Sequence, residues 1–197
     1  MRVDRILALN TAQSVGGWMR EQQLLWLYDT AAALGDDRPR TWAEVGVWMG
    51  RSLSAVVCGI AAGSTVYAVD HFQGSEDEFD STIKLVDKMG GTGELVGSFN
   101  KTRARLAELR PDVEIVVMQM DSLSAASGCP NAAFDAIFID AAHTTEAVLH
   151  DVRAWKPKLR DSGLLCGHDI ADSRVLAGLR QADLNVRAEP CGIWVAT

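Results

Sequence analysis

Residues 41–60 read TWAEVGVWMGRSLSAVVCGI, and they predict a strand, a glycine turn and a helix in direct succession. The first part is short and mostly apolar and runs into a glycine, as a buried strand does before a tight turn. The second part has apolar residues at helical spacing, namely Leu53, Val56, Val57 and Ile60. A strand that passes through a glycine turn into a helix is typical of α/β proteins, so this stretch indicates the fold class.

The same alternation continues along the chain. Further strands are predicted at STVYAVD (64–70), VEIVVMQMD (113–121), FDAIFID (134–140), GLLCGHD (163–169) and, as a pair around a Pro-Cys-Gly turn, LNVRAEPCGIWVAT (184–197). The segments between most of these strands have helical periodicity. The pattern predicts an α/β fold that is Rossmann-like and doubly wound: a mostly parallel seven-stranded sheet with helices on both faces.

One domain, residues 1–197, accommodates this pattern. Residues 1–39 are expected to form a helical cap, with a helix from Trp18 to Leu34 that ends before Gly35. Residues 71–100 are polar and rich in glycine, and they are interpreted as a surface insertion, either a lid or a spacer, with a helical segment at 79–89.

Four predicted strands end in an aspartate: Asp70, Asp121, Asp140 and Asp169. In parallel sheets the ligand lies at the carboxyl ends of the strands, so these carboxylates should gather along one edge. The first strand-to-helix turn places Glu44, Gly46, Gly50 and Ser52 at that edge. Asp70 follows Gly50 by 20 residues, the usual place of an acid that binds ribose hydroxyls. These features indicate an adenosine-bearing ligand, although a glycine turn can also be only a tight turn.

The turn contains GxxxG and not the GxGxxG of dinucleotide-binding proteins, and Glu44 would repel a pyrophosphate. A ligand with an amine or a sulfonium cation suits the acidic site better. With these motifs in place, the chain resembles the class I S-adenosylmethionine (SAM)-dependent methyltransferases, in the metal-dependent O-methyltransferase branch of the catechol and macrolide-sugar type. The resemblance covers about residues 40–197 and implies that the last two strands form an antiparallel hairpin.

The resemblance also implies roles for individual residues. Glu44, Gly46 and Ser52 would hold the methionine part of SAM, and Gly50 of the same turn also belongs to the cofactor site. Asp70 would bind the ribose, His71 would lie against the adenine, and Asp121 and Ser122 would border the base. Asp140 matches the family's first metal ligand, and His168 and Asp169 stand where the family has its other two. His143 matches the position of the general base. His168 departs from the usual oxygen donor, so Mn²⁺, Fe²⁺ or Zn²⁺ would fit better than Mg²⁺. The alternatives are that His168 is not itself a ligand or that no metal is bound.

The leading hypothesis is therefore a SAM-dependent O-methyltransferase that acts on a hydroxyl of a small molecule, a sugar or a phenol, with help from a divalent cation such as Mg²⁺ or Mn²⁺. A nicotinamide-dependent oxidoreductase and a non-catalytic nucleotide-binding module are the alternatives.

Composition and charge indicate which kinds of partner the protein can bind. The formal net charge of -7 argues against nucleic acid, and the basic run from Lys101 to Arg110 is interpreted as the solvated face of a helix. Four scattered cysteines and the lack of a long apolar segment predict a cytoplasmic protein that does not enter membranes. The apolar N-terminal helix either covers the acceptor site or pairs with a second subunit to form a homo-oligomer.

Overall fold

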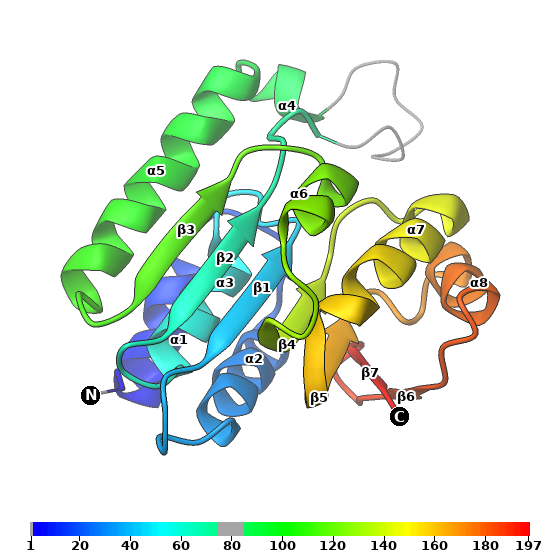
Figure 1. The fold of residues 1–197 in the computed structure, drawn as a ribbon. Coiled ribbons are helices and arrows are strands. Elements are labelled where there is room, and N and C mark those ends of the chain that lie inside the picture. The colour runs from blue at the N-terminus through cyan, green and yellow to red at the C-terminus, as the bar shows by residue number, and fades with distance from the viewer. Residues whose placement is uncertain (1, 75–84) are drawn as a thin grey trace.

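A sheet of seven strands forms the centre of residues 2–74 and 85–197, the part of the chain that the computed structural model describes (Figure 1). The strands are β1 (Thr41–Val45), β2 (Thr65–Val69), β3 (Glu114–Met118), β4 (Phe134–Ile139), β5 (Leu159–Gly167), β6 (Val186–Ala188) and β7 (Trp194–Ala196). Their order is β3-β2-β1-β4-β5-β7-β6. The first five pair in parallel, whereas β7 is antiparallel to both β5 and β6. The predicted fold class, including the terminal hairpin, is confirmed.

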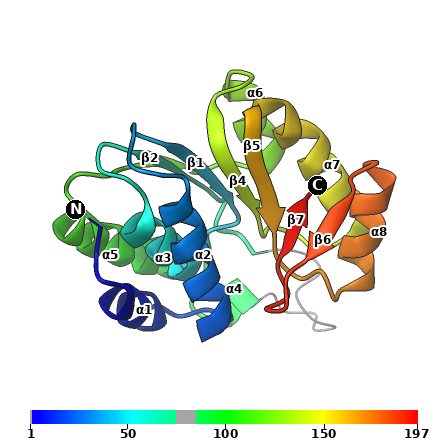
Figure 2. The same ribbon diagram turned by 90° about the horizontal axis from the view of Figure 1, so that it is seen from below.

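Helices cover both faces of the sheet. They are α1 (Arg5–Gln13), α2 (Glu21–Ala33), α3 (Arg51–Gly59), α4 (Leu85–Lys88), α5 (Thr92–Leu109), α6 (Ser122–Gly128), α7 (Thr145–Trp155) and α8 (Ser173–Gln181), with a 3₁₀ turn at Lys156–Lys158. Figure 2 shows α1, α2 and α3 on one side of the sheet and α6, α7 and α8 on the other. None of the helices in the described ranges is both long enough and apolar enough to cross a bilayer.

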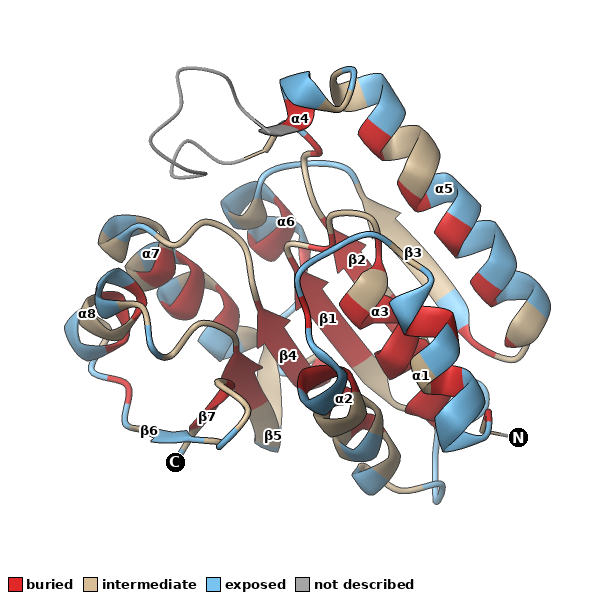
Figure 3. Cartoon of the chain, turned by 180° about the vertical axis from the view of Figure 1, so that it is seen from behind, coloured by how far each residue is buried: buried red, intermediate tan, exposed pale blue. Residues whose placement is uncertain are grey.

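Each face of the sheet has its own hydrophobic core. Trp42 and Phe138 pack on the side of α1, α2, α3 and α5, while Ala43 and Ile137 pack on the side of α6, α7 and α8. Successive residues of a strand point to opposite faces, so an almost continuously apolar strand is buried on both. Figure 3 shows this as buried residues along the central strands.

The N-terminal region contains two helices where the sequence predicted one. The buried residues of α1 are small (Ala8, Thr11 and Ala12), and its larger Ile6 and Leu7 are exposed, so α1 has a weak apolar stripe. The predicted helix from Trp18 begins only at Glu21. Residues 14–20 instead form a loop between α1 and α2, and Arg51 holds this loop by donating to the carbonyls of Gln13, Val15 and Met19.

Part of the predicted insertion at 71–100 is regular structure. Helix α5 begins at Thr92 and continues to Leu109, so residues 92–100 belong to it. The helical segment predicted at 79–89 is described only from residue 85, as α4, and residues 75–84 lie outside the described part.

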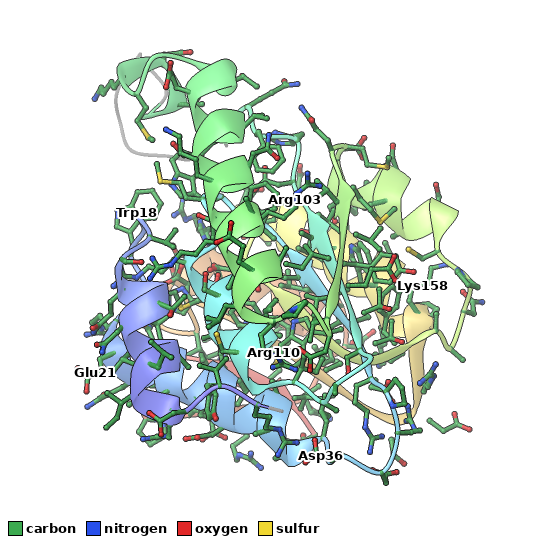
Figure 4. The ribbon with its side chains drawn as sticks, turned by 90° about the vertical axis from the view of Figure 1, so that its left-hand side faces the viewer. Trp18, Glu21, Asp36, Arg103, Arg110 and Lys158 are labelled. Atoms are coloured by element: carbon green, nitrogen blue, oxygen red, sulfur yellow. The ribbon has the colours of Figure 1, made fainter. Side chains whose placement is uncertain are left out.

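The basic run also needs a correction. Lys101, Arg103 and Arg105 are exposed, but Arg110 is buried and donates to the carbonyls of Val57, Cys58 and Ile60 at the end of α3 (Figure 4).

Candidate active site

A cavity of about 1090 Å³ lies at the carboxyl ends of the parallel strands. The four aspartates that end strands all line it, as predicted. The other predicted site residues on its wall are Gly46, Ser52, His71, Ser122, His143 and His168. Glu44 and Gly50 are not part of the wall. The loop between α1 and α2 also contributes, through Gly16 to Met19.

The glycines of the first turn are needed for backbone geometry. Gly46 has a φ of +91°, and a Cβ atom on it would lie 2.1 Å from the carbonyl oxygen of Asp140. Gly50 has a φ of +87° and faces Phe99 and Thr102 of α5, away from the cavity. Glycine adopts positive φ without the steric penalty of a Cβ. Gly46 therefore allows the end of β1 to approach the end of β4, and Gly50 is the N-cap residue of α3.

Glu44 lies behind the cavity wall and is fully buried. Its Oε1 accepts a hydrogen bond of 2.6 Å from Ser52, which does line the cavity, and its buried Oε2 has no hydrogen-bond partner in the part of the chain that the structure describes. Burial raises the pKa of Glu44 to about 8, because it disfavours the charged form. Glu44 is thus joined to the cavity through Ser52.

Asp70 is held in place by backbone groups on both sides. Trp48 N–H donates to Oδ2 at 2.8 Å, and Phe72 N–H donates to Oδ1 at 2.7 Å. The next residue, His71, accepts from Gln73 N–H through Nδ1 at 2.9 Å. Each carboxylate oxygen has a second lone pair, so Asp70 can still accept from the two hydroxyls of a ribose.

Asp121 and Ser122 begin α6 at the same edge. Asp121 accepts from Ser124 N–H and caps the helix, and these bonds with Ser124 lower the pKa of Asp121. Ser122 donates to Asp151 at 2.5 Å and accepts from the indole N–H of Trp155 at 2.9 Å. The wall here is therefore a connected network of polar groups.

Asp151 was missed by the sequence analysis. It is buried, it lines the cavity, and burial raises its pKa to about 6. A signal was present, since Asp151 lies on the apolar stripe of α7 with Val148, Val152 and Trp155. A carboxylate at a core-facing helical position is rarely tolerated without a partner or a function.

Two aspartates and two histidines meet where β4 and β5 end. His143 Nε2 lies 3.6 Å from Asp140 Oδ1 and 3.1 Å from Asp169 Oδ2. His168 Nδ1 lies 3.5 Å and 3.2 Å from the same two oxygens. His143 reaches this cluster from the turn before α7, whose N-cap is Thr144. Asp169 has a φ of +55°, a strained conformation for an aspartate that is often found at functional sites.

The charges of this cluster reinforce one another. Hydrogen bonds to Asp140 and Asp169 raise the pKa of His143 to about 10. Burial lowers the pKa of His168, but the same carboxylates outweigh it and raise that pKa to about 10. In return, the histidines lower the pKa of Asp169, and they outweigh burial to lower that of Asp140. Both carboxylates are therefore ionised.

One ligand atom each from Asp140, His143 and Asp169 lies within 4.8 Å of the others, as metal ligands do. This set differs from the predicted one, which had His168 in place of His143. His168 instead contacts Gln23 of α2, a buried residue that the sequence analysis did not identify.

Two tryptophans line the same cavity as this cluster. Trp18, 58% exposed, comes from the loop between α1 and α2, and Trp48 comes from the glycine turn. Their ring centroids are 5.5 Å apart. Trp48 has a φ of +50°, so the turn holds it in a conformation that few tryptophans adopt. The cavity thus has an aromatic wall as well as an acidic one.

Comparison with known proteins identifies the family. A sequence profile described as a methyltransferase domain matches residues 43–170. An O-methyltransferase from Bacillus cereus in complex with S-adenosylhomocysteine (SAH) is similar in structure. It has 18% identity and a TM-score of 0.58, and the match covers 98% of this chain and 89% of that one. An SAH-bound methyltransferase from Podospora anserina has 12% identity, a TM-score of 0.62, and coverage of 98% and 87%. A methyltransferase from Geobacter sulfurreducens has 16% identity, a TM-score of 0.59, and the same coverage.

The matched segment begins in β1 and ends just after Asp169, so it contains the glycine turn and all four strand-ending aspartates. The solved structures share the fold over almost the whole chain. The predicted family is confirmed, and it displaces the nicotinamide-dependent alternative. The chain belongs to the class I S-adenosylmethionine-dependent methyltransferases.

Proposed function

We propose that the chain transfers the methyl group of SAM to a hydroxyl oxygen of a small sugar or phenol, assisted by a divalent cation. The observation that carries this proposal is that one cavity contains both Asp70 and the cluster of Asp140, His143, His168 and Asp169. The first can bind the ribose of the cofactor, and the second can bind a cation next to a hydroxyl. The O-methyltransferase of Bacillus cereus supports the choice of oxygen as the acceptor.

The residues at the first turn fit SAM. Among the described residues the buried Oε2 of Glu44 has no hydrogen-bond partner, and burial disfavours its ionised form. The ammonium group of the methionine part would supply positive charge on the cavity side of Ser52. Asp70 would accept from the ribose hydroxyls, and Asp121, Ser122 and Asp151 offer polar groups to the base.

The cluster fits a divalent cation. It offers two ionised carboxylates, Asp140 and Asp169, whose oxygens suit Mg²⁺ or Mn²⁺, with the imidazole of His143 next to them. Such a cation, when bound, acts as a Lewis acid that lowers the pKa of a coordinated hydroxyl. Asp140 and Asp169 would hold it, with His143 beside them.

His143 is the residue that would accept the hydroxyl proton as the oxygen attacks the sulfonium methyl. In the structure its two carboxylate contacts favour the protonated imidazole, which cannot act as a base. Protonation and cation binding compete for the same carboxylates. His143 would therefore act as a base when Asp140 and Asp169 contact another group in place of its imidazole. Its ability to accept a proton then depends on whether the site is occupied.

The test is a methyl-transfer assay with isotope-labelled SAM and a panel of sugars and phenols, run with Mn²⁺ and with EDTA. We expect transfer to one acceptor class that EDTA abolishes, and its loss in Asp140→Asn but not in the control Asp161→Asn, an exposed residue at the other end of β5. Binding of SAM without transfer to any acceptor would favour the non-catalytic alternative. Transfer that EDTA does not change would rule out the cation.

A further inference from the structure

Asp151 is a buried carboxylate on the wall of the cavity, away from the cluster at the ends of β4 and β5. It is 5% exposed and lies on the same side of α7 as Val148 and Val152. In the described part of the chain Ser122 is its one hydrogen-bond partner, and no lysine or arginine forms an ion pair with it. Burial of a carboxylate costs free energy unless donors compensate it. The carboxylate can therefore accept from a group that enters the cavity.

The indole of Trp155 sets the direction of the hydrogen bond between Ser122 and Asp151. Trp155 Nε1 donates to Ser122 Oγ at 2.9 Å, and Ser122 Oγ lies 2.5 Å from Asp151 Oδ1. An indole N–H can only donate, so the hydroxyl hydrogen of Ser122 is free to point at the carboxylate. These two bonds fix the carboxylate in place and leave it as an acceptor.

The other carboxylate at this end of the cavity has a different environment. Asp121 is exposed, and it accepts from Ser124 N–H as the N-cap of α6. An exposed carboxylate that loses a ligand donor bonds to water instead, whereas a buried one carries the full desolvation cost. Asp151 is therefore the carboxylate that can distinguish a ligand with an N–H group from a ligand without one.

The base is the part of SAM that reaches Asp151. The proposed function places the methionine part at the turn after β1 and the ribose at Asp70 after β2. Ser122 and Leu123 of α6 and Ala147 and Asp151 of α7 form a further part of the wall, with apolar side chains beside the polar ones. Adenine has flat faces that suit apolar contacts, and its 6-amino group has N–H donors on the edge of the ring.

We propose that Asp151 is a specificity-determining residue that accepts a hydrogen bond from the 6-amino group of the SAM adenine, with Ser122 and Trp155 as positioning residues behind it. The proposal rests on the cofactor placement in the proposed function, but it involves neither the cation nor the methyl acceptor. A 6-oxo group would bring a carbonyl oxygen against the carboxylate, two acceptors without a hydrogen between them. Asp151 thus makes the cavity selective for a 6-aminopurine over a 6-oxopurine.

The first test needs no variant. Calorimetric titration of the wild-type protein compares SAH with S-inosylhomocysteine, in which a carbonyl oxygen replaces the 6-amino group. SAH should bind about 10- to 100-fold more tightly, the usual effect of leaving a buried charged acceptor without its donor. Affinities within about threefold of each other would overturn the proposal.

The second test repeats both titrations with Asp151→Asn and with Asp161→Asn, an exposed control, after thermal unfolding has shown both to be folded. Asp151→Asn should lose or reverse the preference, because its carboxamide has N–H groups that can donate to a 6-carbonyl. Asp161→Asn should keep the preference. A full preference for SAH in Asp151→Asn would assign the 6-amino group to another residue and overturn the proposal.

The 2′-deoxy form of SAH separates a local effect from a general one, because this change lies at the ribose. It should weaken binding equally in the wild type and in Asp151→Asn, and unequal losses would contradict a role confined to the base. Selectivity for SAH without methyl transfer to any acceptor would contradict the proposed function and support this inference. Methyl transfer with equal binding of SAH and S-inosylhomocysteine would do the reverse.

Discussion

Asp135 and Asp140 belong to the same apolar segment and have different roles. Asp135, in β4, is buried among Arg38, Arg160 and the N–H of Thr41. Asp140 follows the last residue of β4 and lines the cavity. Ligands of parallel sheets bind at the carboxyl ends of the strands, so the sequence predicts which of the two aspartates is available to a ligand. At the residue scale, position relative to the strand end therefore decides which carboxylate is available to a ligand.

His143→Ala should lower turnover by about 10²- to 10⁴-fold, the usual contribution of a general base, while SAH affinity stays nearly unchanged. Steady-state kinetics with the identified acceptor and calorimetry with SAH measure the two effects. His150→Ala, which removes an imidazole on the cavity wall outside the cluster, is the control and should retain most of the turnover. Normal turnover in His143→Ala would remove His143 from the mechanism.

Asp70→Asn should weaken SAH binding about 10- to 100-fold, because a hydrogen bond to a charged group contributes about 1.5–3 kcal/mol. The amide oxygen keeps one acceptor for the neighbouring backbone N–H groups, so the turn should stay folded. Calorimetric titration with SAH measures the change, with Asp161→Asn as the matched control. Equal affinities in the two variants would mean that Asp70 does not bind the ribose.

Glu44 should make stability depend on pH. Burial raises its pKa from 4.5 to about 8, so folding favours the neutral form. The contribution of Glu44 to the free energy of unfolding is complete below pH 4.5 and is lost as the pH rises towards 8. Glu44→Gln keeps a neutral side chain, so its stability relative to the wild type should increase over this range by more than about 1 kcal/mol, since one pKa unit corresponds to about 1.4 kcal/mol. Urea unfolding at several pH values measures this, and a pH-independent difference would contradict it.

At the scale of elements, buried polar links hold the helices that frame the cavity. Arg110 follows α5 and satisfies carbonyls at the end of α3, and it also pairs with Asp112, whose pKa it lowers to about 2. Arg51 begins α3 and holds the loop between α1 and α2. Arginine is suited to both tasks because its guanidinium has five N–H donors.

Arg110→Met should destabilise the fold by about 3 kcal/mol or more, because it removes the buried hydrogen bonds to the carbonyls of α3 and the ion pair with Asp112. Arg103→Met, on the exposed side of α5, should change stability by about 0.5 kcal/mol or less. Urea denaturation of both variants gives the comparison (Figure 4 labels both arginines). Similar midpoints for the two would show that Arg110 does not contribute to the stability of α3.

The strands and the residues at their ends could be predicted from the sequence because buried parallel strands are continuous apolar runs. Two helices show where this fails. The buried residues of α1 are too small to give a clear apolar stripe. The start of α5 contains Gly93 and Gly97, which disfavour a helix, so this segment is helical because Leu95 and Phe99 pack in the core. The contact of Gln23 with His168 joins residues 145 positions apart, a distance that no local pattern encodes.

At the scale of the whole molecule, the cavity combines segments from both halves of the chain. The loop at 16–19 and the ends of β1 and β2 form one side, and the ends of β4 and β5 form the other. The parallel order β2-β1-β4-β5 brings these ends to one edge (Figure 1). We propose that this arrangement holds SAM and a divalent cation next to each other.

The most direct measurement is the ¹³C NMR linewidth of SAM labelled at its methyl group and bound to the protein, with Mn²⁺ or with diamagnetic Mg²⁺. We predict that Mn²⁺ broadens the methyl signal in the wild type and in Asp161→Asn, and that Asp140→Asn removes the broadening while SAM stays bound. A methyl signal that remains sharp at saturating Mn²⁺ would contradict the account, because the cation and the cofactor would then occupy separate sites.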